Sequence, residues 1–267
     1  MNAIQATILG LVQGLTEFLP VSSSGHLILA RDIMRLPLTN SLVFDAILHI
    51  ATALAVIIYF RKELGRLRLT FYALILRRAN IDPTEKTLFW AIIIGALPAA
   101  IIGAVWGDAI EGLLRGTVVV VVTLLLGSIL FVIAEKYKRQ TETLTKKKGL
   151  LIGFFQLLAF MPGFSRSGST ISGGLLLGMK RDEAARFSFL MGLPIMLGAG
   201  GVQILHLFKG GAVSEPIMPL TLAFVFAFAS GLFAIHWLLK FLKANTLYSF
   251  VWYRVILAIL ITAWFFL

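Results

Sequence analysis

Six apolar stretches account for much of this chain, and each is long enough to cross a lipid bilayer as one helix. A hydrocarbon core of about 30 Å takes about 20 helical residues. The stretches cover residues 42–60, 88–106, 117–135, 186–206, 217–240 and 248–267. This pattern predicts an all-α, polytopic integral membrane protein with six transmembrane helices.

Two further apolar regions, residues 3–34 and 149–179, follow a different pattern. Each consists of two short apolar pieces separated by a proline and a cluster of serine and glycine. Irregular backbone is tolerated at membrane depth only where protein or a water-filled cavity surrounds it. Each region therefore predicts a re-entrant helical hairpin rather than a complete span.

The polar residues of the two hairpin regions repeat at one fixed offset. Residues of the same type recur 143 positions apart: Gln13 with Gln156, Ser22 with Ser165, Ser24 with Ser167, Gly25 with Gly168, and Phe44 with Phe187. We therefore expect a single transmembrane domain made of two repeats, residues 1–135 and 149–267, joined by the basic linker 136–148.

The charge distribution predicts how these segments are oriented. Loop 61–87 holds seven Lys or Arg residues and linker 136–148 holds six, whereas loop 107–116 holds only Arg115. Cytoplasmic loops carry the excess of basic residues, so 61–87 and 136–148 are expected inside the cell. The first hairpin then enters from outside and the second from inside, which is an inverted-topology repeat.

Composition excludes several other classes of protein. The chain is 58% hydrophobic and 14% charged with a mean hydropathy of +0.91, and it contains no cysteine. A soluble domain, disulfides and thiolate chemistry are thereby excluded. The net charge of +11 lies in the short loops, so it indicates topology and not nucleic-acid binding. No Lys or Arg precedes Arg31, so we expect no signal peptide and an N-terminus that belongs to the mature protein.

The first hairpin carries groups suited to proton transfer and nucleophilic attack. Gln13 and Glu17 are four residues apart and share one face of a helix. An ionised Glu among apolar residues is costly unless paired, which favours a functional role over a protonated Glu bonded between helices. Ser22 and Ser23 precede a helix start, where hydroxyls and free N–H groups bind anions or cap the helix. His26 adds a group able to act as acid, base or nucleophile.

The second hairpin carries groups suited to binding phosphate. Arg166 offers a planar fork of donors inside a turn of small polar residues. Ser165, Ser167 and Thr170 add hydroxyls at the start of the following helix. The alternative interpretation, that Arg166 only neutralises Glu17, is compatible with this role.

Asp45, His49 and Arg254 are further polar residues inside predicted spans. Asp45 and His49, four residues apart, could bind a proton, orient His26 or hydrogen-bond to neighbouring helices. Arg254 lies near one end of the last span, where a long side chain can reach the membrane surface.

A carboxylate, an imidazole, hydroxyls and a guanidinium brought together by two hairpins suit phosphoryl transfer from a substrate that arrives through the membrane. The attacking group stays open between Ser23, His26 and an activated water. The competing hypothesis is a transporter or lipid flippase that uses the same inverted-repeat site. Transport requires binding but no nucleophile, so that hypothesis explains Ser23 and His26 less well. An ion channel is disfavoured because no acidic or carbonyl filter repeats.

The chain resembles the bacitracin-resistance family of undecaprenyl-diphosphate phosphatases, over essentially its whole length. The resemblance is carried by residues 13–26, QGLTEFLPVSSSGH, and by residues 162–170, PGFSRSGST. It implies a bacterial inner-membrane enzyme that removes the terminal phosphate of a long-chain isoprenyl diphosphate. The product, undecaprenyl phosphate, is the recycled lipid carrier of cell-wall peptidoglycan synthesis, and the activity confers bacitracin resistance. The oligomeric state stays open, a homo-oligomer included.

The resemblance also implies roles for particular residues. It assigns the site to Glu17, Ser23, His26, Ser165, Arg166 and Thr170, facing the extracytoplasmic side, with a divalent cation, Mg²⁺ or Ca²⁺. Glu17, with Gln13, is the candidate metal ligand. Many members carry Glu where this chain has Gln13, which weakens a two-carboxylate site. His49 stands where a Gln is expected, so the resemblance assigns it no role.

Overall fold

The computed structural model describes residues 1–36, 41–77, 81–114, 116–208 and 216–266. Within those ranges the chain is helical and contains no strand, as predicted. Arg78 and Arg115, counted above for topology, lie outside them. In chain order the helices are α1 (Ala3–Phe18), α2 (Ser23–Ile33), α3 (Ser41–Tyr59), α4 (Arg61–Ile75), α5 (Pro83–Leu114), α6 (Thr117–Tyr137), α7 (Lys146–Gln156), η2 (Leu157–Phe160), α8 (Arg166–Leu176), α9 (Arg181–Phe208), α10 (Ile217–Ala244) and α11 (Tyr248–Phe266).

Five described helices, α5, α6, α9, α10 and α11, are long and apolar enough to cross a membrane. A sixth candidate span consists of α3 and α4 together, which are bent by 82° with respect to one another. The chain is therefore a polytopic membrane protein.

Two predicted loops are wrong in detail. Residues 61–75, expected in a loop, form helix α4, and α5 continues to Leu114 through most of the predicted loop 107–116. In α4, basic residues such as Arg61 and Arg66 alternate with apolar residues such as Leu67 and Phe71. This mixture lowers hydropathy to that of a loop, yet it suits a helix at the membrane surface.

The two hairpins have matching backbones. Helices α2 and α8 are each 11 residues long and begin 143 positions apart. Their N-caps, Ser22 and Ser165, both have positive φ angles, 75° and 79°. Each serine oxygen accepts a hydrogen bond from a backbone N–H three residues on, that of Gly25 or Gly168. These matched pairs support the predicted repeat; its opposed orientation in the membrane stays a prediction.

The first helix of each hairpin packs closely against a long helix of the other half of the chain. Helix α1 lies against α10, and α7 lies against α5. Glycines four residues apart allow both contacts, Gly10 and Gly14 in α1 and Gly149 and Gly153 in α7. A Cβ atom at any of them would collide with the backbone of the facing helix. Small residues at this spacing are typical of helix pairs in membranes.

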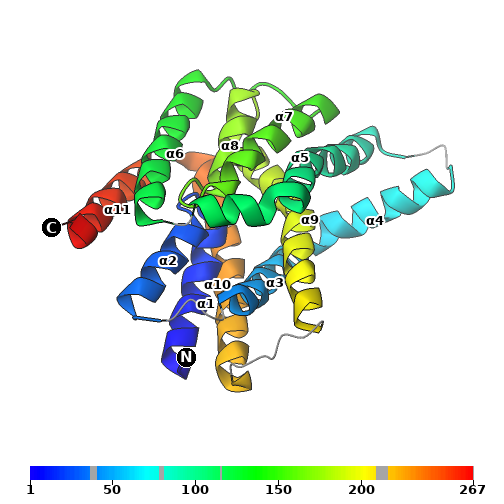
Figure 1. Ribbon diagram of the computed structural model, residues 1–267. Helices are drawn as coiled ribbons and strands as arrows, with labels where there is room; N and C mark the ends of the chain where they lie inside the picture. Colours follow the sequence, from blue (N-terminus) through cyan, green and yellow to red (C-terminus); the bar gives the residue numbers. More distant parts are fainter. Residues whose placement is uncertain (37–40, 78–80, 115, 209–215, 267) are drawn as a thin grey trace.

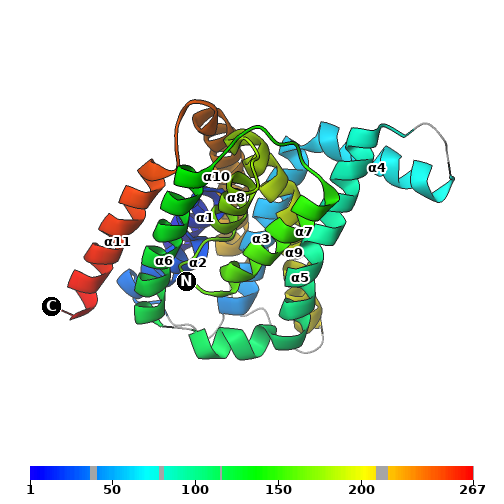
Figure 2. The same ribbon diagram turned by 90° about the horizontal axis from the view of Figure 1, so that it is seen from above.

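The hairpins meet near the centre of the molecule, with α6 and α11 at one edge and α4 at the opposite edge (Figures 1 and 2). The largest apolar cluster surrounds them and includes Phe18, Phe60, Phe131 and Phe189. Phe18 of the first hairpin packs edge-on against Phe189 of α9, with ring centroids 5.3 Å apart. The polar turns are thus held inside an apolar shell.

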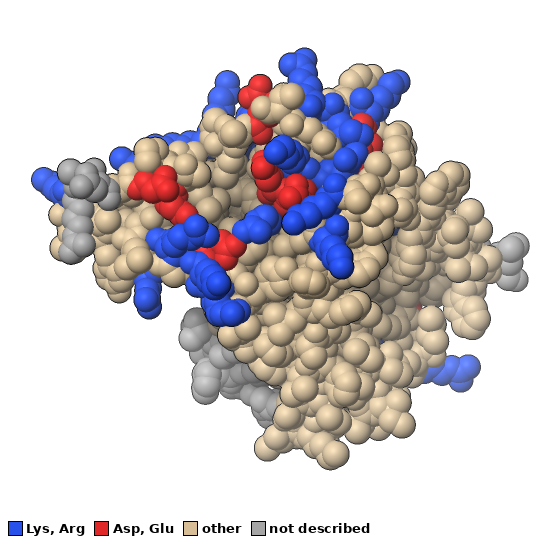
Figure 3. Space-filling model, turned by 180° about the vertical axis from the view of Figure 1, so that it is seen from behind, with Lys and Arg blue, Asp and Glu red and all other residues tan. Residues whose placement is uncertain are grey.

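Charged side chains gather toward one end of the face drawn in Figure 3. Among the charged residues, the buried Glu135 forms ion pairs with Arg181 and Lys138. Its carboxylate accepts hydrogen bonds from Arg181, Lys138 and the backbone N–H of Leu247. These contacts join α6, α9 and the start of α11. This distribution is the one expected if that end faces the cytoplasm.

Candidate active site

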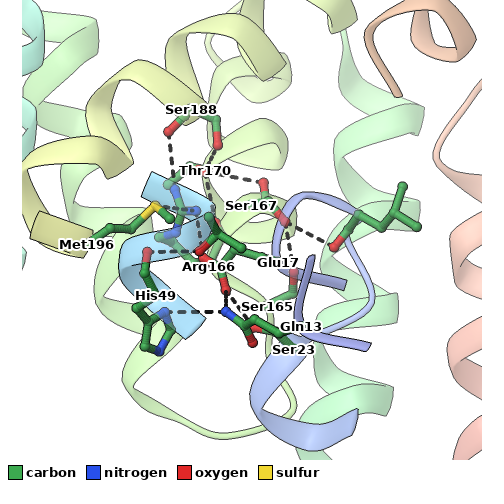
Figure 4. Close-up of polar contacts among 12 residues, drawn as sticks. Gln13, Glu17, Ser23, His49, Ser165, Arg166, Ser167, Thr170, Ser188 and Met196 are labelled. Atoms are coloured by element: carbon green, nitrogen blue, oxygen red, sulfur yellow. Dashed lines mark hydrogen bonds and ion pairs between the residues drawn. The ribbon is translucent and has the colours of Figure 1, made fainter. Parts of the chain in front are cut away.

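Glu17 of α1 and Arg166 of α8 form the central contact between the hairpins. Arg166 Nη2 lies 2.9 Å from Glu17 Oε1, and the two side chains are only 12% and 6% exposed (Figure 4). Arg166 also donates to the backbone carbonyl of Ser188, at 3.3 Å. Pairing makes the burial of both charges tolerable. The structure thus brings together the predicted anion-binding residue and the predicted carboxylate.

The second oxygen of Glu17 accepts hydrogen bonds from two neutral residues. Ser23 Oγ donates to Oε2 at 2.7 Å, and Gln13 Nε2 donates to it at 3.2 Å. A hydroxyl held this close to an ionised carboxylate can pass its proton to it as the oxygen attacks. Ser23 and Glu17 therefore have the arrangement of a nucleophile and its general base.

His49 of α3 extends this network, although the sequence left its role open. Its Nδ1 lies 3.4 Å from Gln13 Nε2. Because an amide nitrogen only donates, Nδ1 of His49 is the acceptor. The two N–H bonds of Gln13 are thus directed to Glu17 and His49, and its buried Oε1 has no hydrogen-bond partner among the described residues. That free oxygen can accept a bond from, or coordinate, something that enters the site.

The donors around Glu17 suit a divalent cation only in part. Among the described residues there is no group of three or more His, Cys, Asp or Glu side chains. The available oxygens are the Glu17 carboxylate and the unpaired Gln13 Oε1. Mg²⁺ is commonly bound by one or two carboxylates together with substrate phosphates. The residues therefore fit a cation that takes some of its ligands from the protein and the others from the substrate phosphates.

His26 points toward α11. Its Nδ1 lies 2.7 Å from the Ser22 carbonyl, and its Nε2 lies 2.7 Å from the hydroxyl of Tyr253. The carbonyl only accepts, so Nδ1 carries a proton, and in the neutral ring Nε2 accepts from Tyr253. Sequence reasoning missed Tyr253, which is 227 residues away. The only sequence feature that could have indicated Tyr253 was its position next to Arg254 inside an apolar span.

The hydroxyls predicted to bind phosphate all form hydrogen bonds within the protein, and two of them join the hairpins. Ser22 Oγ accepts from the backbone N–H of Gly163 at 3.1 Å, and Ser167 Oγ donates to the Leu19 carbonyl at 3.2 Å. Thr170 Oγ1 donates to the Arg166 carbonyl at 2.8 Å and lies 2.6 Å from Ser188 Oγ. Ser165 caps its helix. Their roles toward phosphate stay predictions.

Arg254 does not reach the membrane surface, so that interpretation is wrong. Its side chain is fully buried. The guanidinium donates to carbonyls of both hairpin turns, Pro20 at 3.3 Å and Gly163 and Phe164 at 3.0 and 3.1 Å. It also bonds to carbonyls of α6 and lies over the Phe131 ring. Irregular turns at membrane depth expose carbonyls that require donors, and Arg254 supplies them.

Asp45 lies outside this network. Its carboxylate forms an ion pair with Arg31 at the end of α2. Of its three possible roles, the structure supports hydrogen bonding between neighbouring helices.

The fold and the site define a polytopic membrane protein with a buried polar centre, in which a carboxylate contacts a guanidinium and a serine hydroxyl. The family model described as "Bacitracin resistance protein BacA" matches residues 6–260, and the chain belongs to this family. It is 40% identical to the undecaprenyl-diphosphatase of Myxococcus xanthus, over 98% of this chain and 88% of the relative. It is 39% identical to that of Rubrobacter xylanophilus, over 98% of both chains. A third relative of that name, from Mycolicibacterium smegmatis, is 40% identical over 98% of this chain and 96% of its own.

Proposed function

We propose that this protein hydrolyses the terminal phosphate of undecaprenyl diphosphate and releases undecaprenyl phosphate. Family membership and the names of its relatives support the substrate. The observation that carries the chemistry is the 2.7 Å bond from Ser23 to a carboxylate whose other oxygen pairs with Arg166. The product would return to cell-wall synthesis as the lipid carrier, and the activity would confer bacitracin resistance.

In the mechanism that this geometry supports, Ser23 Oγ attacks the terminal phosphorus while Glu17 Oε2 takes the hydroxyl proton. The bond to the bridging oxygen breaks, and that oxygen leaves with the prenyl phosphate. Arg166 stabilises the charge on the terminal phosphate, because its fork has further N–H groups beside those bonded to Glu17 and Ser188. After Glu17 has released that proton to the departing prenyl phosphate, a water molecule attacks the phosphoserine and gives a proton to Glu17. Glu17 returns this proton to Ser23 Oγ as the P–O bond to serine breaks.

Ser23 is favoured over His26 as the nucleophile because both ring nitrogens of His26 are engaged elsewhere. Glu17 and Gln13 Oε1 are the residues that would hold a divalent cation, Mg²⁺ or Ca²⁺. When bound, such a cation supplies positive charge to the phosphate oxygens.

The position of the site among membrane helices supports a lipid substrate. A long prenyl chain gains about 0.8 kcal/mol for each CH₂ group kept out of water. We propose that the chain lies between helices while the diphosphate enters from the extracytoplasmic side of the bacterial inner membrane. A water-soluble short-chain diphosphate should then be a poor substrate.

The test is phosphate release from undecaprenyl diphosphate by the purified protein in detergent, with Mg²⁺ or Ca²⁺ present. We expect release by the wild type and its loss in Ser23→Ala and Glu17→Ala. Ser24→Ala is the matched control, because the Ser24 hydroxyl bonds only to Ser22 among the described residues. Acid quenching should trap phosphate on Ser23. A wild type that releases no phosphate would leave the transporter hypothesis ahead.

A further inference from the structure

The substrate carries two phosphates, and the centre at Glu17 and Arg166 accounts for one of them. On the proposed function, the phosphate that stays attached to the prenyl chain is therefore left without a binding group. One bridging oxygen joins the two phosphorus atoms, so that phosphate must lie next to the reacting one, on the side from which the lipid chain extends. The groups that bind it should therefore lie close to Ser23, on a side of the site that is open to the bilayer.

The pair formed by His26 and Tyr253 meets both conditions. His26 is three residues after Ser23 on α2, so the two side chains are neighbours one turn apart. Tyr253 comes from α11, and its side chain is 45% exposed. Helix α11 lies at the edge of the molecule beside α6, away from the centre of the bundle (Figures 1 and 2). The pair thus stands between the reacting centre and the membrane.

The two side chains offer what a phosphate monoester needs. The Tyr253 hydroxyl is a donor, and Nε2 of His26 accepts when the ring is neutral and donates when it is protonated. The second pKa of a phosphate monoester is about 6, so near neutral pH it carries both acceptor oxygens and, in part, a donor O–H. The 2.7 Å contact between Tyr253 and His26 is the bond that such a phosphate would open and bridge.

The surroundings favour an anion at this position. The residue next to Tyr253 is Arg254, whose guanidinium bonds only to backbone carbonyls and the Ser128 hydroxyl within the described residues. Its positive charge is therefore not neutralised by a carboxylate contact. A buried cation of this kind attracts negative charge more strongly than one in water.

We propose that Tyr253, together with His26, binds the phosphate that remains on the prenyl chain, while Arg166 binds the phosphate that is released. Tyr253 is then a residue of the active site that recognises the leaving product. This assignment also explains why His26 faces α11 instead of Ser23 and Glu17.

The two products of the reaction separate the two phosphate positions. The experiment measures inhibition of phosphate release by undecaprenyl monophosphate and, separately, by inorganic phosphate. In Tyr253→Phe we expect the inhibition constant for undecaprenyl monophosphate to rise about tenfold, the loss of one hydrogen bond to a charged group. The constant for inorganic phosphate should stay unchanged. In Arg166→Lys, the larger change should be in the constant for inorganic phosphate.

Tyr248→Phe is the matched control, since it makes the same substitution on the same helix at an exposed tyrosine. The rise in Tm produced by undecaprenyl monophosphate gives the same comparison without turnover, because a ligand stabilises according to its concentration and Kd. Equal changes for both products in Tyr253→Phe, or no change, would overturn the assignment of Tyr253 alone. A wild type without phosphate release would overturn the proposed function as well.

Discussion

The two hairpins share a backbone and differ in burial and chemistry. Three of the eleven residues of α2 are buried, against nine of eleven in α8. Helix α8 packs against α6, α7 and α9, whereas the one extensive contact of α2 among the described residues is with α1. The hydroxyl proposed to attack lies on the more exposed helix α2, and the guanidinium proposed to hold phosphate lies on the more buried helix α8.

This difference shows how one motif can serve two tasks. A binding group gains from a rigid, dry environment, because its donors are held in place and their charge is less screened. A reacting group must also be reached by a lipid from the bilayer. The glutamines show the same division: Gln13 bonds to Glu17 and His49, whereas neither amide atom of Gln156 has a partner in the described part of the chain. At the equivalent positions, 160 and 192, the second repeat has Phe and Gly.

Removing the guanidinium of the buried hairpin should have the largest effect. Arg166→Ala takes away the proposed phosphate ligand and also leaves Glu17 buried without its counterion. We expect kcat/KM for phosphate release to fall by about 10³-fold or more. Arg166→Lys keeps the charge but loses the fork, so it should retain more activity than Arg166→Ala.

The exchange variant Ser23→Arg with Arg166→Ser tests whether the hairpins are interchangeable. Glu17 stays on the first hairpin, where it would then face an arginine of its own hairpin, while the exchanged serine would stand on the second hairpin. We expect no phosphate release above that of Arg166→Ala. Activity near that of the wild type would show that the asymmetry described above has no chemical meaning.

Arg254 joins the two hairpins, and its loss should weaken both. Arg254→Met leaves carbonyls of both turns buried without donors, which should destabilise the protein by about 3 kcal/mol. For a chain of this size that corresponds to a Tm lower by about 6–12 °C in thermal unfolding. Arg186→Met is the control: Arg186 pairs with Glu63 at a half-exposed position and should matter by less than about 1 kcal/mol. Equal losses from both variants would contradict the role of Arg254.

The sequence was sufficient to predict what depends on local pattern. Apolar run length located five spans, whereas the predicted span 42–60 qualifies only together with α4. The interrupted regions located both helix pairs that carry Glu17, Ser23 and Arg166. Helix α4 was missed because its basic residues made an amphipathic helix resemble a loop. The contacts of Tyr253 and Arg254 were beyond prediction, since their partners His26, Pro20 and Gly163 are distant in the chain and only packing brings them together. For the same reason, the pattern of hydroxyls did not reveal which ones hold the hairpins.

A substitution at His49 tests the hydrogen bonds among Glu17, Gln13 and His49, which have no counterpart in the second repeat. His49→Leu removes the acceptor that orients the Gln13 amide, so Oε1 can turn toward Glu17 and repel it. We expect kcat/KM to fall about tenfold, the equivalent of one hydrogen bond to a charged group. His49→Gln keeps an acceptor at that position and should lose less. If His49→Leu were as active as the wild type, the Gln13 contact would be irrelevant to the site.

The smallest expected difference concerns the two N-cap serines. Both have positive φ, so glycine at either position relieves backbone strain while losing a capping oxygen, and these effects nearly cancel. Ser22 Oγ differs in one respect, because it also accepts the N–H of Gly163 from the other hairpin. Ser22→Gly should therefore destabilise by about 1 kcal/mol more than Ser165→Gly, a Tm difference of about 2–4 °C. A larger loss in Ser165→Gly would show that the buried hairpin depends more on its cap, and that the bond from Gly163 contributes little to holding the hairpins together.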